Sequence, residues 1–253
     1  MSILLFGDCL ELLDTVEDNS VDLIYCDLPY ATNTFGKCVN CEWDKPIDLK
    51  VLWAKLMKKK KINTPIFMSC NVKLGYDLIS TAPKKCPFRY ELIWVKSMGS
   101  GFLNSKRMPL RKHELIYVFY EKLPFYDLSS HTHKFQDNQL VEEIRKDKHI
   151  TAYGENIHYH NNQQKNGESI YNPPLPNSIL EIKSIKKGNH ATEKPVDLIK
   201  WILKYYSKEG DIVLDCTMGS GTTGIACKEM NRNFIGIELN PEIYEIAVNR
   251  IEN

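Results

Sequence analysis

Short apolar segments follow one another through the first half of the chain, and their spacing changes between strand and helix patterns. Residues 21–26 alternate and then run apolar, with β-branched and aromatic side chains, which is typical of a buried strand. Residues 64–69 repeat this character, whereas residues 48–57 carry apolar side chains at helical spacing. Two more strands are predicted at 90–95 and 114–120, either as a hairpin with a long loop or as neighbours in a sheet.

The C-terminal part of the chain alternates strand and helix patterns more regularly. Lys194-Pro195 precedes apolar residues at helical spacing, and proline is well tolerated at the start of a helix. A strand at 212–215, a glycine turn at 219–221, a helix at 222–230, a strand at 234–238 and a helix at 241–251 follow. Such alternation predicts an α/β fold with a parallel sheet and helices on both faces.

Residues 121–188 differ from both regions that flank them. They are rich in His, Asn, Gln, Lys and Pro, and they contain few long apolar runs. The segment Tyr171-Asn-Pro-Pro-Leu-Pro176 cannot lie inside a helix, because its prolines lack the backbone donor that a helix needs. We therefore expect a loop-rich insertion between residues 1–120 and 189–253, and loops of this length are usually functional or disordered.

The bulk composition is that of an ordinary globular protein. The 253 residues are 43% hydrophobic and 26% charged, values that suit one large α/β domain with an insertion. No run of eighteen apolar residues occurs, and the first residues lack the basic and apolar regions of a signal peptide. We expect an intracellular protein without a membrane segment.

Charge is distributed unevenly, although the net charge is only +1. Residues 84–112 contain eight Lys and Arg residues against one acid, which favours contact with phosphates. The run Lys58 to Lys61 is interpreted instead as a solvated helix end, where cations suit the helix dipole.

Eight cysteines are present, and most lie in or beside apolar patterns. They are expected to be small core side chains in a reducing compartment. Cys38 and Cys41 have the spacing of half a zinc site, but no second such pair follows. We therefore predict no metal site.

The segment 212–238 has the features of a βαβ ligand site. Its two strands end in Asp215 and Glu238, and glycines follow the first strand. In such folds the ligand binds at the carboxyl ends of the strands, glycines let the backbone approach it, and a terminal acid accepts ribose hydrogen bonds. On spacing alone, a nicotinamide or flavin cofactor remains open.

Several motifs resemble those of one enzyme family. The segments Asn189-His-Ala-Thr-Glu-Lys-Pro195, Asp211-Ile-Val-Leu-Asp-Cys-Thr-Met-Gly-Ser-Gly-Thr-Thr223 and Arg232-Asn-Phe-Ile-Gly-Ile-Glu238 resemble the cofactor-binding half of amino-DNA methyltransferases, which make N6-methyladenine or N4-methylcytosine. Gly7-Asp8-Cys-Leu-Glu-Leu-Leu13 and Ser20-Val-Asp-Leu-Ile-Tyr-Cys-Asp-Leu-Pro-Tyr30 resemble the catalytic half. The catalytic motif comes first, as in the circularly permuted β group.

The resemblance implies a Rossmann-like S-adenosylmethionine-dependent methyltransferase fold. Its sheet would be mostly parallel and seven-stranded, with helices on both faces and a circularly permuted order. Residues 1–120 would form the catalytic half, residues 121–188 a small target-recognition insertion, and residues 189–253 the cofactor-binding half.

The resemblance also assigns roles to single residues near the cofactor. Asp215 and the glycine turn would line the methionine portion, Glu238 would bind the ribose hydroxyls, and Thr192 and Lys194 would lie close by. The complete predicted cofactor set is Asp8, Asp27, Thr192, Lys194, Asp215, Thr217, Gly219, Ser220, Gly221, Thr222, Thr223 and Glu238.

Asp27-Leu28-Pro29-Tyr30 is the predicted catalytic tetrapeptide. A base amino nitrogen is a poor nucleophile, so the enzyme must align it with the methyl group and favour an sp³-like nitrogen. The Asp27 carboxylate and the Leu28 carbonyl would accept the amino hydrogens, Pro29 would fix the turn, and Tyr30 would stack on the extruded base. The family usually has Pro where this chain has Leu28, which removes a backbone constraint.

Double-stranded DNA is the predicted substrate, with Lys96, Lys106, Arg107 and Arg111 as phosphate contacts. Residues 31–45 are predicted either to close over the base or to form a plain surface loop. An Asp-first, Tyr-last motif favours adenine N6 over cytosine N4. A catalytically inactive DNA-binding relative and an RNA methyltransferase are the alternatives. The resemblance also allows a homodimer and a cognate restriction enzyme as partners, in the cytoplasm.

Overall fold

The computed structural model divides the chain into two compact units, residues 1–126 with 178–253 and residues 127–177. The helices in the described part of the chain include none with the length and hydropathy of a membrane span. The structure describes residues 1–30, 46–133, 149–151, 154–156, 164–165, 168–169, 171–185 and 193–252. Thr192, Cys38, Cys41 and the loop 31–45, all named in the predictions, lie outside the described residues.

An eight-stranded sheet in the order β1-β14-β13-β2-β3-β5-β4-β12 forms the centre of the larger unit. Every pairing is parallel except those of β5, which runs antiparallel to both of its neighbours. The strands are β1 Ser2–Phe6, β2 Leu23–Asp27, β3 Ile66–Cys70, β4 Phe88–Ser100, β5 Arg111–Phe119, β12 Ile179–Leu180, β13 Ile212–Asp215 and β14 Asn233–Glu238.

The mostly parallel α/β fold is confirmed, but the predicted count of seven strands is wrong by one. The extra strand, β12, is two residues long and pairs with Ile93 and Trp94 of β4. A segment so short has no period that could distinguish it from a loop.

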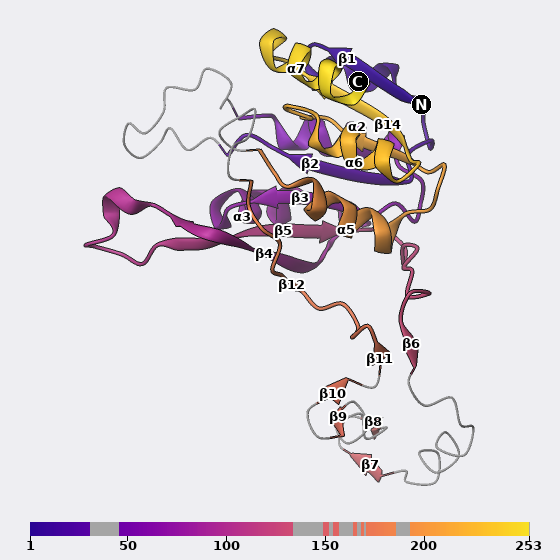
Figure 1. The fold of residues 1–253 in the computed structure, drawn as a ribbon. Coiled ribbons are helices and arrows are strands. Elements are labelled where there is room, and N and C mark those ends of the chain that lie inside the picture. The colour runs from indigo at the N-terminus through magenta and orange to yellow at the C-terminus, as the bar shows by residue number, and fades with distance from the viewer. Residues whose placement is uncertain are drawn as a thin grey trace. The chain divides into compact units, whose positions relative to one another are not determined.

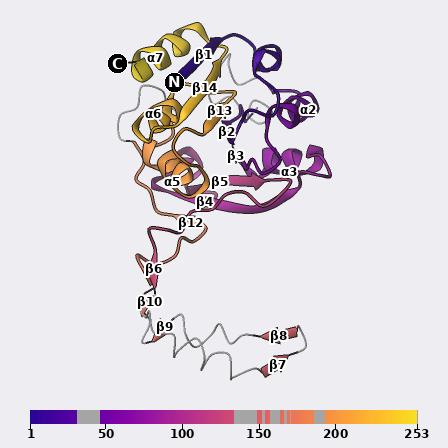
Figure 2. The ribbon, with the colours of Figure 1, turned by 90° about the vertical axis from the view of Figure 1, so that its right-hand side faces the viewer.

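Helices cover both faces of the sheet, as predicted (Figures 1 and 2). On β2, Leu23 and Tyr25 contact one core cluster, while Ile24 and Cys26 contact the other, because successive side chains of a strand point to opposite faces. Helices α5, α6 and α7 contribute to the first cluster, and α2 and α3 to the second. The helices are α1 Cys9–Leu12, α2 Leu49–Lys59, α3 Val72–Thr81, α5 Val196–Tyr206, α6 Thr222–Glu229 and α7 Pro241–Glu252, with short 3₁₀ turns at Leu13–Thr15 and Phe102–Asn104.

The two middle strands β4 and β5 form one long hairpin, which resolves the open alternative between a hairpin and separate neighbours. β4 extends beyond both of its predicted ends, and β5 begins before its predicted start. Figure 1 shows the hairpin extending past the edge of the sheet. Every residue from Gly101 to Leu110, at its tip, is exposed.

The interpretation of the lysine run at the end of α2 as a solvated helix end is wrong for two of its residues. Lys59 and Lys60 are buried, with exposed fractions of 5% and 3%. Lys59 Nζ donates to Asp18 Oδ1 at 2.6 Å, and Lys60 Nζ donates to Glu121 Oε2 at 3.0 Å. Acids distant in sequence supply these partners, so the local pattern gave no sign of them.

The smaller unit contains short antiparallel pairs. β6 Thr132–His133 pairs with β11 Tyr171–Asn172, β7 His149–Thr151 with β8 Gly154–Asn156, and β9 Gln164–Lys165 with β10 Glu168–Ser169. None of its described residues belongs to either core cluster. This agrees with the scarcity of apolar runs in this part of the sequence.

Candidate active site

Four acids gather at one edge of the sheet. Asp8 follows β1, while Glu238, Asp215 and Asp27 are the last residues of β14, β13 and β2. These four strands are parallel neighbours, so their carboxyl ends meet at the same edge. The Gly7 N–H donates to the Glu238 carbonyl at 3.0 Å, which brings Asp8 beside β14. Asp8 itself is exposed and caps α1 through the Leu10 N–H at 2.6 Å.

The glycine turn between β13 and α6 needs glycine for two reasons. Gly219 and Gly221 have φ angles of 54° and 85°, a region that side chains with a Cβ disfavour. A Cβ on Gly221 would also lie 2.9 Å from Ile251 and 3.2 Å from Ala247 on α7. The turn therefore keeps the shape that lets backbone N–H groups approach the carboxylate edge.

Asp215 is held by neutral donors. The Thr223 hydroxyl donates to Oδ2 at 2.6 Å, and the Thr217 N–H donates to Oδ1 at 3.1 Å. Only 2% of Asp215 is exposed, and burial raises its pKa to about 7, against the effect of these hydrogen bonds. The buried Thr217 hydroxyl has no hydrogen-bond partner among the described residues. A polar ligand at this edge would satisfy it.

Glu238 is oriented by two backbone groups. The Gly219 N–H donates to Oε2 at 3.0 Å, and the Asn240 N–H donates to Oε1 at 2.8 Å. Each carboxylate oxygen keeps capacity for a further hydrogen bond, so the fixed carboxylate can accept two ribose hydroxyls. Ribose binding by Glu238 stays a prediction.

Ser220 in the turn and Thr222 at the start of α6, two more predicted cofactor residues, are buried. Arg250 donates to the Ser220 carbonyl at 2.7 Å and to its hydroxyl at 2.8 Å. Arg250 also pairs with Glu193 at 2.5 Å. Sequence reasoning missed Arg250, because its partners lie 30 and 57 residues away and share no motif with it.

The catalytic tetrapeptide follows β2 directly. The Asp27 carboxylate accepts from Lys194 Nζ at 2.5 Å on Oδ2 and from the Tyr30 hydroxyl at 3.3 Å on Oδ1. Burial raises the pKa of Asp27, and the Lys194 charge offsets only part of that effect. Leu28 is 2% exposed and packs in the core, which anchors the turn although the family's usual proline is missing.

Lys194, which is predicted to lie close to the cofactor, contacts the catalytic tetrapeptide directly. Its ammonium group lies between two carboxylates, 2.5 Å from Asp27 and 3.4 Å from Glu114. Lys96 Nζ pairs with the other Glu114 oxygen at 3.1 Å. Glu114 is absent from the predicted site residues, because its link to Asp27 runs through Lys194, which is distant in the sequence.

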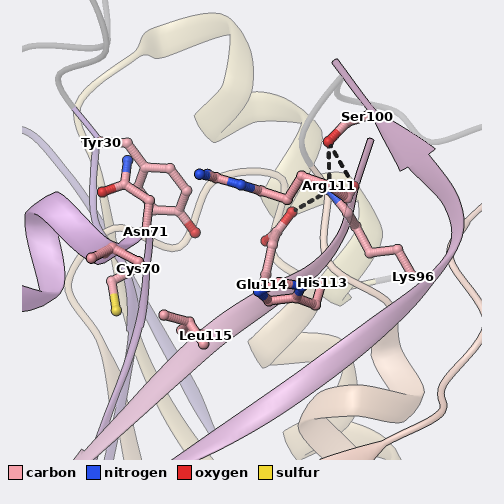
Figure 3. A pocket seen from close by; sticks show the side chains of 10 residues that line it. Tyr30, Cys70, Asn71, Lys96, Ser100, Arg111, His113, Glu114 and Leu115 are labelled. Atoms are coloured by element: carbon pink, nitrogen blue, oxygen red, sulfur yellow. Dashed lines mark hydrogen bonds and ion pairs between the residues drawn. The ribbon is translucent and has the colours of Figure 1, made fainter. Parts of the chain in front are cut away.

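A pocket of about 300 Å³ lies beside the tetrapeptide (Figure 3). This volume is at the lower end of the range for small-ligand sites. Figure 3 shows the Arg111 guanidinium directed across the pocket toward the Tyr30 ring. Of the predicted DNA contacts, Lys96 and Arg111 line the pocket, while Lys106 and Arg107 are exposed at the hairpin tip. The lining residues are Tyr30, Cys70, Asn71, Val72, Lys96, Ser100, Arg111, His113, Glu114 and Leu115.

Two curated proteins resemble nearly the whole chain. The type II methyltransferase M.HinfI of Haemophilus influenzae is 27% identical over 99% of this chain and 68% of its own length. The DNA adenine methyltransferase YhdJ of Escherichia coli K12 is 25% identical over 98% of this chain and 82% of its own length.

Solved structures share the fold. The complex of M1.HpyAVI with SAM has a TM-score of 0.63 at 23% identity, over 99% of this chain and 100% of that chain. The cytosine-N4-specific PvuII DNA methyltransferase has a TM-score of 0.68 at 16% identity, over 98% and 86%. The family model described as DNA methylase, of the N6/N4 type, matches residues 21–249. This chain therefore belongs to the DNA methylase family.

Proposed function

We propose that this protein transfers a methyl group from S-adenosylmethionine to the N6 amino group of adenine in double-stranded DNA. One observation carries the proposal. Tyr30 lines a base-sized pocket and donates to Asp27, which ends a strand at the sheet edge that also bears Asp215 and Glu238.

The residues of this edge fit the cofactor. Glu238 has two oriented oxygens for the ribose hydroxyls, and the Thr217 hydroxyl is buried without a partner among the described residues. Asp215, with its pKa raised to about 7 by burial, suits a ligand that brings a positive charge. When bound, S-adenosylmethionine supplies an electrophilic sulfonium methyl group.

The acceptor side is derived from this chain's own groups. Asp27 Oδ1 and the Leu28 carbonyl accept the two amino hydrogens and so favour a tetrahedral nitrogen with an available lone pair. The Tyr30 ring stacks on the base, which has to leave the DNA helix to reach the pocket. The nitrogen loses one proton on methylation, and the raised pKa of Asp27 suits this carboxylate to take it.

Adenine is proposed from the Asp-first and Tyr-last tetrapeptide, and from the similarity to YhdJ. Cytosine N4 is the second candidate, because the structural similarity to PvuII methyltransferase has the higher TM-score of the two solved structures described. Leu28 is the residue that favours the third candidate, an inactive DNA-binding relative.

The experiment is transfer of labelled methyl from S-adenosylmethionine to duplex DNA, followed by nucleoside analysis of the product. Wild-type protein is expected to yield N6-methyladenine, and Asp27→Ala is expected to yield no label. Formation of N4-methylcytosine instead would show that cytosine is the target base. Label in RNA but not in duplex DNA would overturn the substrate class, and cofactor binding without transfer to any base would favour the inactive relative.

We also propose a function for each of three segments of the chain. Residues 1–120 and 189–253 supply the catalytic and cofactor halves, in the permuted order, and residues 121–188 supply target recognition. The type II name of M.HinfI supports a cognate restriction endonuclease as partner. Plasmid DNA from expressing cells is then expected to resist that endonuclease. A homodimer and a cytoplasmic location stay predictions.

A further inference from the structure

Four charges of alternating sign connect the catalytic tetrapeptide to the β4–β5 hairpin. Lys194 Nζ lies 2.5 Å from Asp27 Oδ2 and 3.4 Å from Glu114 Oε2. Glu114 Oε1 in turn lies 3.1 Å from Lys96 Nζ. We call Asp27, Lys194, Glu114 and Lys96 the charge chain. Its members come from the end of β2, the residue pair before α5, and both hairpin strands.

The charge chain is largely removed from water. The Lys194 side chain is 8% exposed, and those of Lys96, Glu114 and Asp27 are 16%, 21% and 26% exposed. Glu114 Oε2 is buried and has no hydrogen-bond partner among the described residues. The charged group that lies close to this oxygen in the described structure is the Lys194 ammonium, at 3.4 Å. A buried charge is costly unless an opposite charge lies close, and each inner member here has one on either side.

We propose that Lys194 is a positioning residue for the acceptor carboxylate of Asp27 rather than a cofactor contact, and that Glu114 is the counter-ion that permits it. This inference rests on the proposed methyl transfer and names two residues that shape its acceptor site. It replaces the cofactor-contact role that the motif resemblance implies for Lys194.

The two oxygens of Asp27 have unequal partners. Lys194 holds Oδ2, whereas among the described residues Oδ1 receives only the long 3.3 Å bond from the Tyr30 hydroxyl. Tyr30 lines the pocket, so Oδ1 is the oxygen available to an amino group there. Holding one oxygen fixes the direction of the other, and small errors in such directions are costly in catalysis.

Lys194 alone would work against the reaction. The base nitrogen would gain positive charge as it accepted the methyl group, and a cation next to the acceptor carboxylate would oppose this. Glu114 supplies a compensating negative charge on the far side of Lys194, at the wall of the pocket. The pair orients Asp27 with little net charge added near the nitrogen.

The two residues act on Asp27 in opposite directions. Burial raises the pKa of Asp27 most, the Lys194 charge lowers it, and the Glu114 charge raises it. The titratable groups that face Asp27 from the surrounding elements are Lys194, Glu114, Tyr30, Tyr25, Cys70 and Asp215.

The test is an NMR titration of the Asp27 carboxyl carbon in full-length protein without cofactor or DNA. In Lys194→Met the Asp27 midpoint is expected to move to higher pH by about one to three units, the usual effect of losing a close opposite charge. In Glu114→Gln it is expected to move to lower pH. Lys194→Arg is expected to stay near the wild type, because it keeps the charge.

Lys60→Met is the matched control, because Lys60 is an equally buried lysine paired with Glu121 away from the site. It is expected to lower stability and leave the Asp27 midpoint unchanged. If Lys194→Met unfolds, the opposite shift in Glu114→Gln still tests the charge chain. An unchanged Asp27 midpoint in both variants, or a downward shift in Lys194→Met, would overturn the inference.

Activity gives a second readout. The acid limb of the pH profile of kcat/KM is expected to follow the same two shifts, while the Kd for S-adenosylmethionine stays within about twofold of wild type in Lys194→Met. A large loss of cofactor affinity with no shift of the acid limb would indicate that Lys194 contacts the cofactor and does not position Asp27. Since the NMR titration needs no turnover, it judges this inference even if the proposed methyl transfer fails.

Discussion

Asp215 and Asp27 end neighbouring parallel strands, yet they are held by different kinds of partner. Within the described part of the chain, Asp215 accepts only from neutral donors, Thr223 and Thr217, which follow it within eight residues. Asp27 accepts from a buried lysine that lies 167 residues away in the sequence. One half of the site is therefore built locally by a turn, and the other half by charges brought together by the whole sheet.

The difference has an electrostatic consequence. Neutral hydrogen bonds only partly offset burial, so the pKa of Asp215 rises to about 7. The buried ammonium of Lys194 opposes the effect of burial on Asp27 with a full charge. The Asp215 carboxylate is suited to a ligand that carries a positive charge. The Asp27 carboxylate already has a positive charge beside it, on Lys194, when no ligand is bound.

The largest expected effect is on methyl transfer in Asp27→Asn. An asparagine keeps the shape but presents an N–H₂ group where the base amino group needs an acceptor, so kcat should fall by about 10³-fold or more. Rates of label transfer under single-turnover conditions measure this. Asp14→Asn, at an exposed ion pair with Lys55, is the control and should leave the rate unchanged. A fall of less than about tenfold in Asp27→Asn would show that Asp27 is not the acceptor for the base amino group.

The next effect is on stability in Asp215→Asn, and its sign depends on pH. Asp215 has a raised folded-state pKa of about 7 against a usual value of 3.8, so ionising it costs stability as pH rises between these values. Replacing it should raise the free energy of unfolding of the ligand-free protein at pH 8, by up to about 4 kcal/mol.

Urea unfolding at pH 8 and at pH 4 measures this difference. The gain should shrink to less than about 1 kcal/mol at pH 4, because Asp215 is then protonated in the folded state and only partly ionised in the unfolded state. A gain of equal size at both pH values would indicate a packing effect instead, and a loss at pH 8 would contradict the raised pKa.

The smallest expected effect is on DNA binding by the hairpin tip. Lys106→Ala and Arg107→Ala should each reduce the slope of log K against log salt concentration by about one, because each removes one phosphate contact. Fluorescence titration at several salt concentrations gives the slope. Lys58→Ala is the control, since Lys58 lies at the end of α2, where that helix meets the amino end of β2. Equal slopes in all three variants would remove the hairpin tip from the DNA contacts.

Site residues whose partners are near in the sequence could be predicted, and those whose partners are distant could not. Asp215, Gly219, Gly221 and Glu238 belong to contiguous motifs, and each is found at the expected edge. Glu114 escaped prediction because its contacts with the site, as far as the described residues show, are ion pairs with residues distant in the sequence. Arg250 escaped for a similar reason, since it reaches Ser220 and Glu193 from the last helix.

The fold follows the same rule. The buried strands were predictable because β2 and β3 are continuous apolar runs, and the helices because their apolar faces repeat. The two-residue strand β12 has no such pattern, and it forms only because β4 offers it a parallel edge. The hairpin could not be distinguished from a pair of sheet neighbours, because its long exposed tip obscures the strand ends.

The division between a cofactor carboxylate and an acceptor carboxylate is tested most directly by calorimetric titration of S-adenosylmethionine into wild type, Asp215→Asn and Asp27→Asn at pH 8. We predict that Asp215→Asn weakens binding by at least about tenfold, the usual loss of one charge-assisted contact, while Asp27→Asn binds within a few-fold of wild type. Full affinity in Asp215→Asn together with lost affinity in Asp27→Asn would contradict the account.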